Sequence, residues 1–162
     1  MIIMAIDPGL ERVGFAIINK NTQNSVFKCI KSGVFLTSKT LIFEKRLELI
    51  YDFISKSIKK FKPKILILER IFFNKNRKTA IAISQSQGVI ILAASINKVK
   101  IEFLAPLQIK SVLTGYGNSD KKSIQKMINL MKITENTITH DDEADAIACG
   151  LAYCYLNNKT VQ

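Results

Sequence analysis

The sequence has few cysteines, the residues that build thiolate metal sites and disulfides, and it lacks the long apolar stretch of a membrane span. Its three cysteines, Cys29, Cys149 and Cys154, show neither a CxxC pair nor the spacing of Cys/His ligands. This pattern argues against a zinc site and favours buried free thiols in a reducing compartment. No apolar stretch approaches the roughly 20 residues that span a bilayer. Met1 leads into a short apolar run that Asp7 ends, unlike a signal peptide. We therefore expect a cytoplasmic protein that does not act at a membrane.

Acidic residues are also scarce: 13 Asp and Glu stand against 24 Lys and Arg, for a net charge of +11. So positive a chain implies a polyanionic partner, with nucleic acid as the first candidate and an anionic membrane surface as the second. A lysine-rich compositional bias accounts for part of the excess, so the charge alone does not identify the partner. The length of 162 residues, the 48% of hydrophobic residues and the 23% of charged residues are ordinary for one globular domain.

Hydrophobic patterns predict alternating strands and helices. Short apolar or β-rich runs bounded by turn residues predict strands, and apolar residues recurring every three or four positions predict helices. The expected strands cover 1–6, 12–19, 25–36, 65–69 and 99–106, and the expected helices cover 41–61, 79–97, two segments within 107–131, and 140–158. The first three strands are spaced as an antiparallel meander. Helical crossovers then add parallel strands, which predicts an α/β fold with a mixed sheet flanked by helices.

The expected helix at 79–97 has no wide polar face. Small or weakly polar residues recur along it, namely Ala80, Ala82, Ser84, Ser86, Gly88, Ala93 and Ala94. A helix of this kind needs cover on two sides. It is therefore central to the core, a contact between two copies of the chain, or both.

Two acidic residues stand at the ends of apolar strands. Asp7 follows "MIIMAI" and precedes Pro-Gly, and Glu69 ends "ILILE". A turn residue and a solvated strand end are the simpler interpretations. However, carboxyl ends of strands are where open α/β sheets place their sites.

The segment "HDDEADAIACG" concentrates further acids at the start of the last helix. Asp142 and Asp145 are three residues apart and share a face, and Asp141 with Asp145 shares it nearly as well. First-turn acids complement the helix dipole, but Asp145 between two alanines suggests partial burial. Carboxylates that converge from strands and helix repel each other unless a cation lies between them. Mg²⁺ suits oxygen ligands, and two such ions can drive phosphodiester hydrolysis. An acidic pocket in a basic surface therefore predicts a nuclease.

These motifs resemble the RuvC family of Holliday-junction resolvases. The matching segments are "DPG" with "RVGFAII", "ILILERIFFNKN", "SQGVIILAA", "GYGNSDKKSIQKM" and "DEADAIA", in the family's order and across essentially the whole chain. The resemblance implies an RNase H-like fold with a five-stranded sheet, in which residues 1–158 form one nuclease domain and 159–162 a short tail. It also implies a homodimer that nicks four-way DNA junctions symmetrically in recombination and repair, leaving 5′-phosphate and 3′-hydroxyl ends. A branch-migration motor is a further implied partner.

The resemblance assigns the catalytic, metal-holding carboxylates to Asp7, Glu69, Asp142 and Asp145. Two Mg²⁺ ions are implied for each site, with Mn²⁺ as a substitute. We expect Asp7 to bridge them, Glu69 and Asp142 to hold one each, and Asp145 to orient the water. Family members commonly have small residues between the helix acids, whereas this chain has Glu143 and Ala144. The extra acids leave Asp141 as an alternative to Asp142.

The resemblance also implies DNA contacts. Phe72 matches an aromatic that stacks on or unpairs a base, and Lys110 and Lys121 match lysines near the scissile phosphate. The expected contacts are Phe72, Lys75, Asn76, Arg77, Lys110, Lys121, Lys122 and Arg12. Gly88 and the small-residue helix around it match the family's dimer helix. His140, the sole histidine, is open between a proton carrier or ligand and a helix-capping or surface residue.

Three rival interpretations remain. A ribonuclease H-type enzyme would use a catalytic Glu on the first long helix, where Glu44 and Glu48 lie, but Glu69 would then be unexplained. A YqgF-like protein shares the opening motif and usually lacks the "GYGNSDKKSIQKM" stretch. A non-catalytic basic module that binds DNA junctions is disfavoured because all four carboxylates are present.

Overall fold

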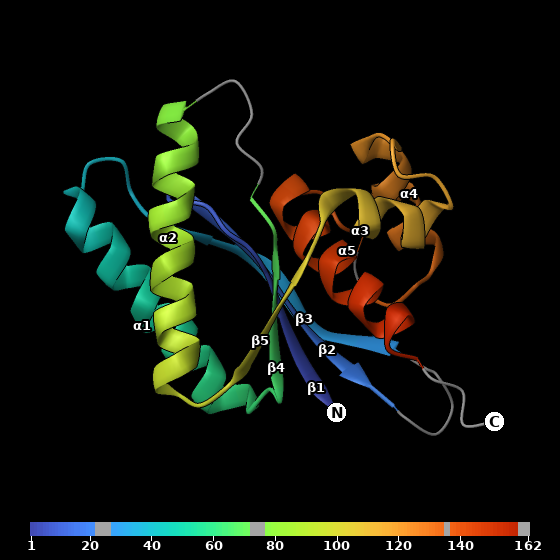
Figure 1. Ribbon diagram of the computed structural model, residues 1–162, viewed down its shortest axis with the longest axis horizontal. Helices are drawn as coiled ribbons and strands as arrows, with labels where there is room; N and C mark the ends of the chain where they lie inside the picture. The colour runs from blue at the N-terminus through green and yellow to red at the C-terminus, as the bar shows by residue number, and fades with distance from the viewer. Residues whose placement is uncertain (22–26, 72–76, 135–136, 159–162) are drawn as a thin grey trace.

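The computed structural model describes residues 1–21, 27–71, 77–134 and 137–158. They form one five-stranded sheet with helices on both faces (Figure 1). The strands are β1 (Ile2–Asp7), β2 (Arg12–Lys20), β3 (Phe27–Leu36), β4 (Ile65–Glu69) and β5 (Lys100–Leu104). The helices are α1 (Phe43–Phe61), α2 (Arg77–Ile96), α3 (Pro106–Thr114), α4 (Lys121–Leu130) and α5 (Asp141–Leu156). The expected order of elements is confirmed.

The sheet order is β3-β2-β1-β4-β5. β1, β2 and β3 form the expected antiparallel meander, and β4 and β5 extend it in parallel from β1. Ile6 pairs with Leu68 in the parallel register of β1 and β4. The next residues, Asp7 and Glu69, therefore end two neighbouring strands at the same edge of the sheet.

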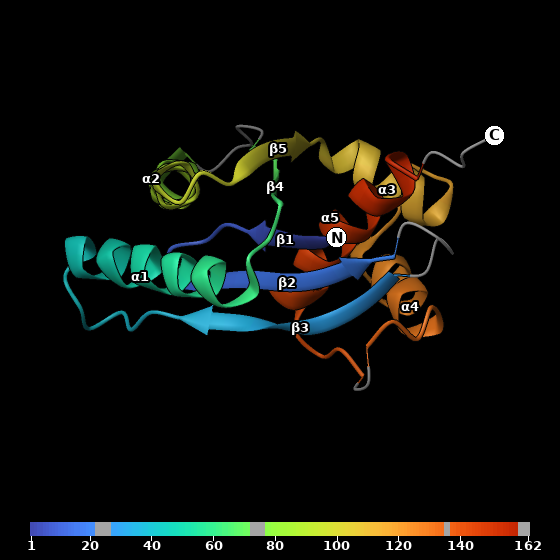
Figure 2. The same ribbon diagram turned by 90° about the horizontal axis from the view of Figure 1, so that it is seen from below.

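The side on which these two acids project follows from the period of two in a strand. Helices α1 and α2 cover one face of the sheet, and α3, α4 and α5 cover the other (Figures 1 and 2). In β1, Met4 and Ile6 pack in the core on the α1 and α2 side, whereas Ile3 and Ala5 pack in the core that contains α5. Alternation then turns Asp7 towards α5. The same alternation holds in β4, so Glu69 faces the same layer.

Helix α5 lies unusually close to the sheet. It packs on β1, β2 and β3, and it is buried from Ala146 to Cys154. Two glycines make this approach possible. A Cβ on Gly14 in β2 would overlap the carbonyl oxygen of Asp142, and a Cβ on Gly150 would lie 2.6 Å from Ile18 Cδ1. The close contact at Gly14 fixes the first turn of α5 against β2.

Helix α2 is covered on one side only within the described part of the chain. It packs against α1 and β5, but Ile81, Leu92 and Ile96 are each more than half exposed. A Cβ on Gly88 would meet no atom of the described chain within 4 Å. The expected cover on a second side is therefore not supplied within the single chain, and a contact between two copies of the chain, the other expected role of α2, stays a prediction. We call the exposed residues Ile81, Gly88, Leu92 and Ile96 the open stripe of α2.

Other local expectations can be checked directly. Asp120, rather than Ser119, caps α4 by accepting a hydrogen bond from the Ser123 amide at 2.8 Å. Cys29, Cys149 and Cys154 are buried free thiols, as expected. In the described part of the chain, no helix is both long and apolar enough to span a bilayer. The expected tail at 159–162 lies outside the described residues.

Candidate active site

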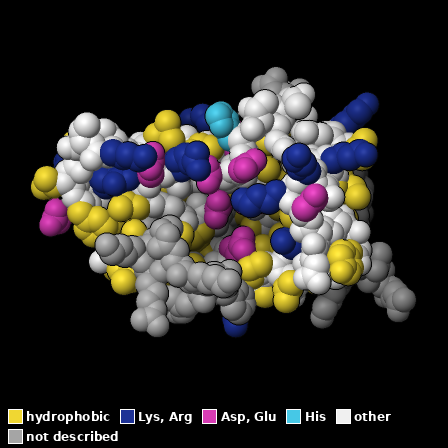
Figure 3. All heavy atoms as spheres, turned by 90° about the horizontal axis from the view of Figure 1, so that it is seen from above, with side chains coloured by type: hydrophobic (Ala, Val, Ile, Leu, Met, Phe, Trp, Pro, Cys, Tyr) yellow, Lys and Arg dark blue, Asp and Glu magenta, His cyan; other side chains and the backbone are white. Residues whose placement is uncertain are grey.

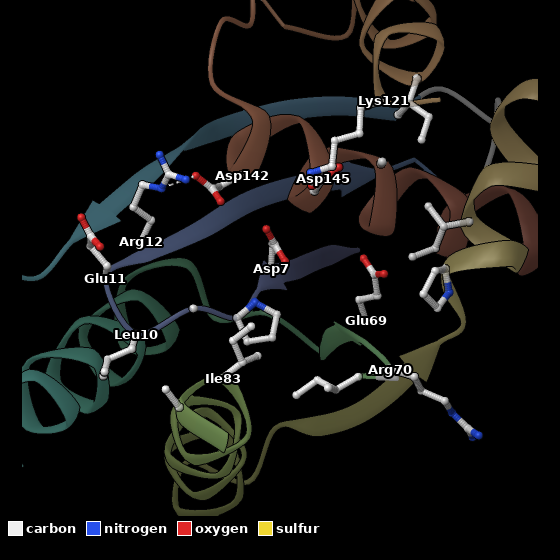
Figure 4. Close-up of a pocket in the computed structure, with 18 of the residues that line it drawn as sticks. Asp7, Leu10, Glu11, Arg12, Glu69, Arg70, Ile83, Lys121, Asp142 and Asp145 are labelled. Carbon is white, nitrogen blue, oxygen red and sulfur yellow. Dashed lines mark hydrogen bonds and ion pairs between the residues drawn. The ribbon is translucent and has the colours of Figure 1, made fainter. Parts of the chain in front are cut away.

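An open cleft of about 870 Å³ lies at the edge of the sheet where β1 and β4 end. Asp7 from β1, Glu69 from β4, and Asp142 and Asp145 from the first turns of α5 all line it (Figure 4). The structure thus brings together four acids that are distant in sequence. Asp141 is exposed and is not among the lining residues, whereas Asp142 is half-buried and points into the cleft.

Basic side chains surround these acids. Figure 3 shows acidic side chains gathered in the middle of this face, with Lys and Arg to either side. Five basic residues line the cleft itself: Arg12, Arg46, Arg70, Lys110 and Lys121. The floor can therefore attract cations while the rim attracts phosphates.

The ionised forms of the two strand acids, Asp7 and Glu69, are disfavoured. Burial, together with the charges of Asp145, Glu69 and Asp142, raises the pKa of Asp7 to about 8. Burial and the charge of Asp145 also raise the pKa of Glu69, although Lys121 and Lys110 oppose the shift. Neither carboxylate has an ion pair or hydrogen bond to another described residue. At the strand ends, nearby lysines therefore compensate the repulsion between acids only in part.

The two helix acids are compensated by basic side chains from different elements. Arg12 Nε lies 2.9 Å from Asp142 Oδ2, and Lys121 Nζ lies 2.6 Å from Asp145 Oδ2. Figure 4 shows the two pairs on separate sides of the cleft. The acids are 23% and 22% exposed, but Arg12 and Lys121 are 61% and 64% exposed, so both cations can move away at little cost.

The donor chemistry fits a hard divalent cation. Carboxylate oxygens are the ligands that Mg²⁺ prefers, and a cation would relieve the repulsion that raises the pKa of Asp7. As the side chains stand, however, no group of three Asp, Glu, His or Cys residues in the described ranges is arranged to hold one ion. Two of the four acids face Arg12 and Lys121 instead. Binding of a metal ion by all four acids would therefore require that Asp142 and Asp145 separate from Arg12 and Lys121.

Other predicted residues fall in different places. Lys110 and Lys121 line the cleft, whereas Lys122 is exposed and outside it. Phe72, Lys75 and Asn76 lie outside the described residues. Arg77 begins α2, but its side chain is not described. His140 is an exposed N-cap residue whose side chain makes no capping bond, and it does not line the cleft.

Two other acids, Glu143 and Glu48, do not line the cleft. Glu143 Oε1 accepts a hydrogen bond from Ser32 Oγ at 2.6 Å and lines a separate pocket beside β3. Glu48 pairs with Lys45 on the solvent side of α1. Neither Glu44 nor Glu48 lines the cleft, which removes the geometric basis for a ribonuclease H-type site on α1.

Sequence reasoning missed Glu11, Arg46 and Arg70, which also line the cleft. Arg70 could have been noticed because it directly follows Glu69. Arg46 had no comparable signal, because it lies on a mixed polar face of α1. Its Nε donates to Thr37 Oγ1 at 2.9 Å, and Thr37 Oγ1 donates to the Leu10 carbonyl oxygen at 2.6 Å. Arg46 therefore braces the turn that follows Asp7.

The chain is similar to known proteins over nearly its whole length. The family model described as crossover junction endodeoxyribonuclease RuvC matches residues 3–154. The protein of that name from Brachyspira hyodysenteriae is 41% identical over 157 residues, which cover 97% of this chain and 96% of the relative. The one from Fusobacterium nucleatum is 41% identical over 148 residues, covering 91% and 77%.

Solved structures show the same fold. T. thermophilus RuvC in complex with a Holliday junction substrate superposes with a TM-score of 0.89 at 22% identity, covering 98% of this chain and 95% of that one. The fowlpox virus resolvase in complex with Holliday junction DNA gives a TM-score of 0.60 at 19% identity, covering 95% and 97%. The predicted fold is thereby confirmed. With the family model spanning nearly the whole chain and relatives above 40% identity, the chain belongs to the RuvC family of crossover junction endodeoxyribonucleases.

Proposed function

We propose that the protein is a divalent-metal-dependent endonuclease that resolves four-way DNA junctions by nicking two strands symmetrically. The observation that carries the proposal is the cleft in which Asp7, Glu69, Asp142 and Asp145 gather inside a basic rim. Membership of the RuvC family supports the junction as substrate. The named structure of a relative with a Holliday junction substrate supports it further.

The four carboxylates would hold the metal, with Asp142 rather than Asp141 as the helix ligand, because Asp142 lines the cleft. We infer two Mg²⁺ ions, replaceable by Mn²⁺. When bound, such ions activate a water molecule and stabilise the charge on the leaving oxygen. The strand acids supply the fixed side of this site because they stand on the buried edge of the sheet. The helix acids supply the adjustable side because they first part from Arg12 and Lys121.

The basic rim would hold the DNA backbone. Lys110, Lys121 and Arg12 lie where phosphates entering the cleft would pass, and contacts of this kind position the strand without reading its sequence. Lys122 is exposed beside them, at the start of α4. Phe72, Lys75 and Asn76, which lie outside the described residues, and Arg77 at the start of α2 are further proposed DNA contacts on family grounds. Because the affinity is electrostatic, junction binding should weaken steeply with salt.

A homodimer is part of the proposal. The open stripe of α2 is apolar and has no partner among the described residues. An exposed apolar stripe on a helix is typical of a contact surface, and a two-fold dimer would present two clefts to a two-fold symmetric junction. A branch-migration motor remains a proposed partner on family grounds alone.

The deciding experiment compares substrates and variants in one assay. Wild type should nick a synthetic four-way junction in Mg²⁺, with much less cleavage of linear duplex or an RNA–DNA hybrid. Asp7→Asn and Glu69→Gln should each lose at least about a thousandfold in nicking rate, because a metal ligand is lost, while still binding the junction. Glu48→Gln is the matched control and should cut normally. Cleavage of the hybrid that depends on Glu48, or nicking by Asp7→Asn, would refute the proposal.

A further inference from the structure

We propose that Ser86 and Gln87 of α2 are positioning residues that fix the separation of the two strand acids from behind the sheet. This inference rests on the proposed function, because it concerns the spacing of the metal-holding carboxylates. We call Ser86 and Gln87 the α2 donor pair.

The α2 donor pair contacts the main chain at both strand ends. Ser86 Oγ donates 2.9 Å to the carbonyl oxygen of Gly9, two residues beyond Asp7. Gln87 Nε2 donates 3.0 Å to the carbonyl oxygen of Glu69 itself. Ser86 is completely buried. Two successive residues of one helix therefore hold the two chain segments that carry the acids.

The chain after Asp7 needs such support because the sheet supplies little of it there, whereas Glu69 pairs with Leu104 of β5. Asp7 is the last residue of β1 in the ladder with β2, where it lies opposite Gly14. Beyond it the chain turns through Pro8, Gly9 and Leu10 without a strand partner. The Glu69 and Asp7 carboxylates repel each other across this edge. Without a tie to a third element, the repulsion would favour their separation.

The direction of the two bonds suits a positioning role. Asp7 and Glu69 project towards α5, whereas α2 lies on the opposite face of the sheet (Figure 1). The donor pair thus restrains the backbone on one face and leaves the carboxylates free on the other. Thr37 holds the Leu10 carbonyl oxygen of the same turn at 2.6 Å, so the segment after Asp7 is tied at two consecutive carbonyls.

Other polar residues of α2 do not act in this way. Ser84 Oγ donates to the Ala80 carbonyl oxygen at 2.8 Å, and Asn97 Nδ2, one residue beyond α2, donates to the Ala93 carbonyl oxygen at 2.8 Å. Both bonds stay within one helical segment. The alternative is that Ser86 and Gln87 only raise the free energy of unfolding, as any buried hydrogen bond does. Ser84 and Asn97 supply the comparison that separates the two roles.

The test measures metal affinity in the full chain without DNA. Mn²⁺ is titrated calorimetrically into wild type, Ser86→Ala and Gln87→Ala, with Ser84→Ala and Asn97→Ala as controls. We expect Mn²⁺ to bind about threefold to tenfold more weakly in the first two variants, the range that one hydrogen bond carries. The controls should stay within about twofold of wild type. Junction nicking at saturating DNA should fall in the same order, and an unfolding curve for each variant reports stability separately.

The outcomes are distinguishable. If Ser86→Ala and Gln87→Ala lose stability but keep wild-type Mn²⁺ affinity, the bonds are structural only and the inference is wrong. If Ser86→Ala does not fold, the Mn²⁺ affinity of Gln87→Ala decides between the two roles. Gln87 is partly exposed, so its replacement opens no cavity in the core. A wild type that binds no Mn²⁺ overturns the proposed function itself, and this inference with it.

Discussion

The strand acids and the helix acids of the cleft are prepared in opposite ways. Asp7 and Glu69 end buried strands, lack ion-pair partners among the described residues and have raised pKa values. Asp142 and Asp145 are paired at 2.9 Å and 2.6 Å with exposed cations. It follows that a metal would gain most of its binding energy from relieving the strand acids. The helix acids contribute after a partner exchange.

Replacement of Asp7 is expected to have the largest effect on the strand half of the site. Because the pKa of Asp7 is about 8 in the folded state against 3.8 for an ordinary aspartate, Asp7 binds its proton more tightly when folded. Its ionisation therefore costs stability as pH rises from about 4 to about 8. Metal-free Asp7→Asn should gain on the order of 5 kcal/mol over wild type at pH 8, and about 2 kcal/mol at pH 5. Urea unfolding in EDTA at both pH values measures the gap.

The control for that experiment is Glu48→Gln, which removes an acid that lies outside the cleft and pairs with Lys45 on α1. It should leave stability unchanged or lower it. A gain in Asp7→Asn that is the same at pH 5 and pH 8 would contradict the assigned charge repulsion.

Gly14→Ala should damage the helix half of the site through packing. The added Cβ would overlap the Asp142 carbonyl oxygen, a backbone atom that moves only if α5 moves. We expect a loss of about 2 kcal/mol in the free energy of unfolding and weaker Mn²⁺ binding. Gly150→Ala is the comparison, because Gly150 lies farther along α5. Its added Cβ would meet the flexible end of Ile18 and the Cβ of Ala5 in β1. If Gly14→Ala destabilises but binds Mn²⁺ normally, α5 does not set the position of Asp142.

Arg12→Ala tests the partner exchange directly. Removal of the guanidinium frees Asp142 in the metal-free state, so Mn²⁺ should bind about twofold to fivefold more tightly, as expected for loss of an exposed ion pair. Calorimetric titration at low salt measures the change. Arg70→Ala removes the same charge from the cleft lining without breaking a pair with an acid. Equal tightening in both variants would mean that the overall field matters and the pair does not.

Glu143→Gln should have the smallest effect. Glu143 lies in the same turn of α5 as Asp142 but bonds to Ser32 at 2.6 Å on the β3 side. We expect nicking and Mn²⁺ affinity within about twofold of wild type and a loss of about 0.5–1 kcal/mol in stability. Asp142→Asn, one residue away, should abolish nicking. A Glu143→Gln protein that loses metal binding would show that the two neighbouring acids share a role.

The two strand acids of the site were predictable because short stretches of sequence identify the strands that they end. An apolar run that ends on Asp or Glu places that acid at a sheet edge, and parallel order brings Asp7 beside Glu69. The helix half was only partly predictable. Spacing alone allowed Asp141 as well as Asp142, and the structure places Asp142 in the cleft because Gly14 fixes the rotation of α5 on β2.

Residues that act through tertiary contacts left no pattern in the sequence. Ser86 and Gln87 look like the neighbouring Ser84 and Gln85, and only the position of α2 behind the sheet distinguishes them. The same limit left the role of α2 open between the core and a contact between two copies, because hydrophobic periodicity reports that a face is apolar without saying which chain covers it. Arg12 was expected as a DNA contact, and its pairing with Asp142 could not be seen before the fold was known.

The hydrogen bonds from α2 end on main-chain oxygens, Gly9 O and Glu69 O, and not on the carboxylate groups. These bonds hold the backbone of the site whether or not the side chains at positions 7 and 69 are carboxylates. Asp7→Asn and Glu69→Gln can remove reactivity while the backbone that presents them stays in place. Such proteins are suited to capture an uncut junction for structure determination, with the DNA lying along the path that it follows in the active enzyme.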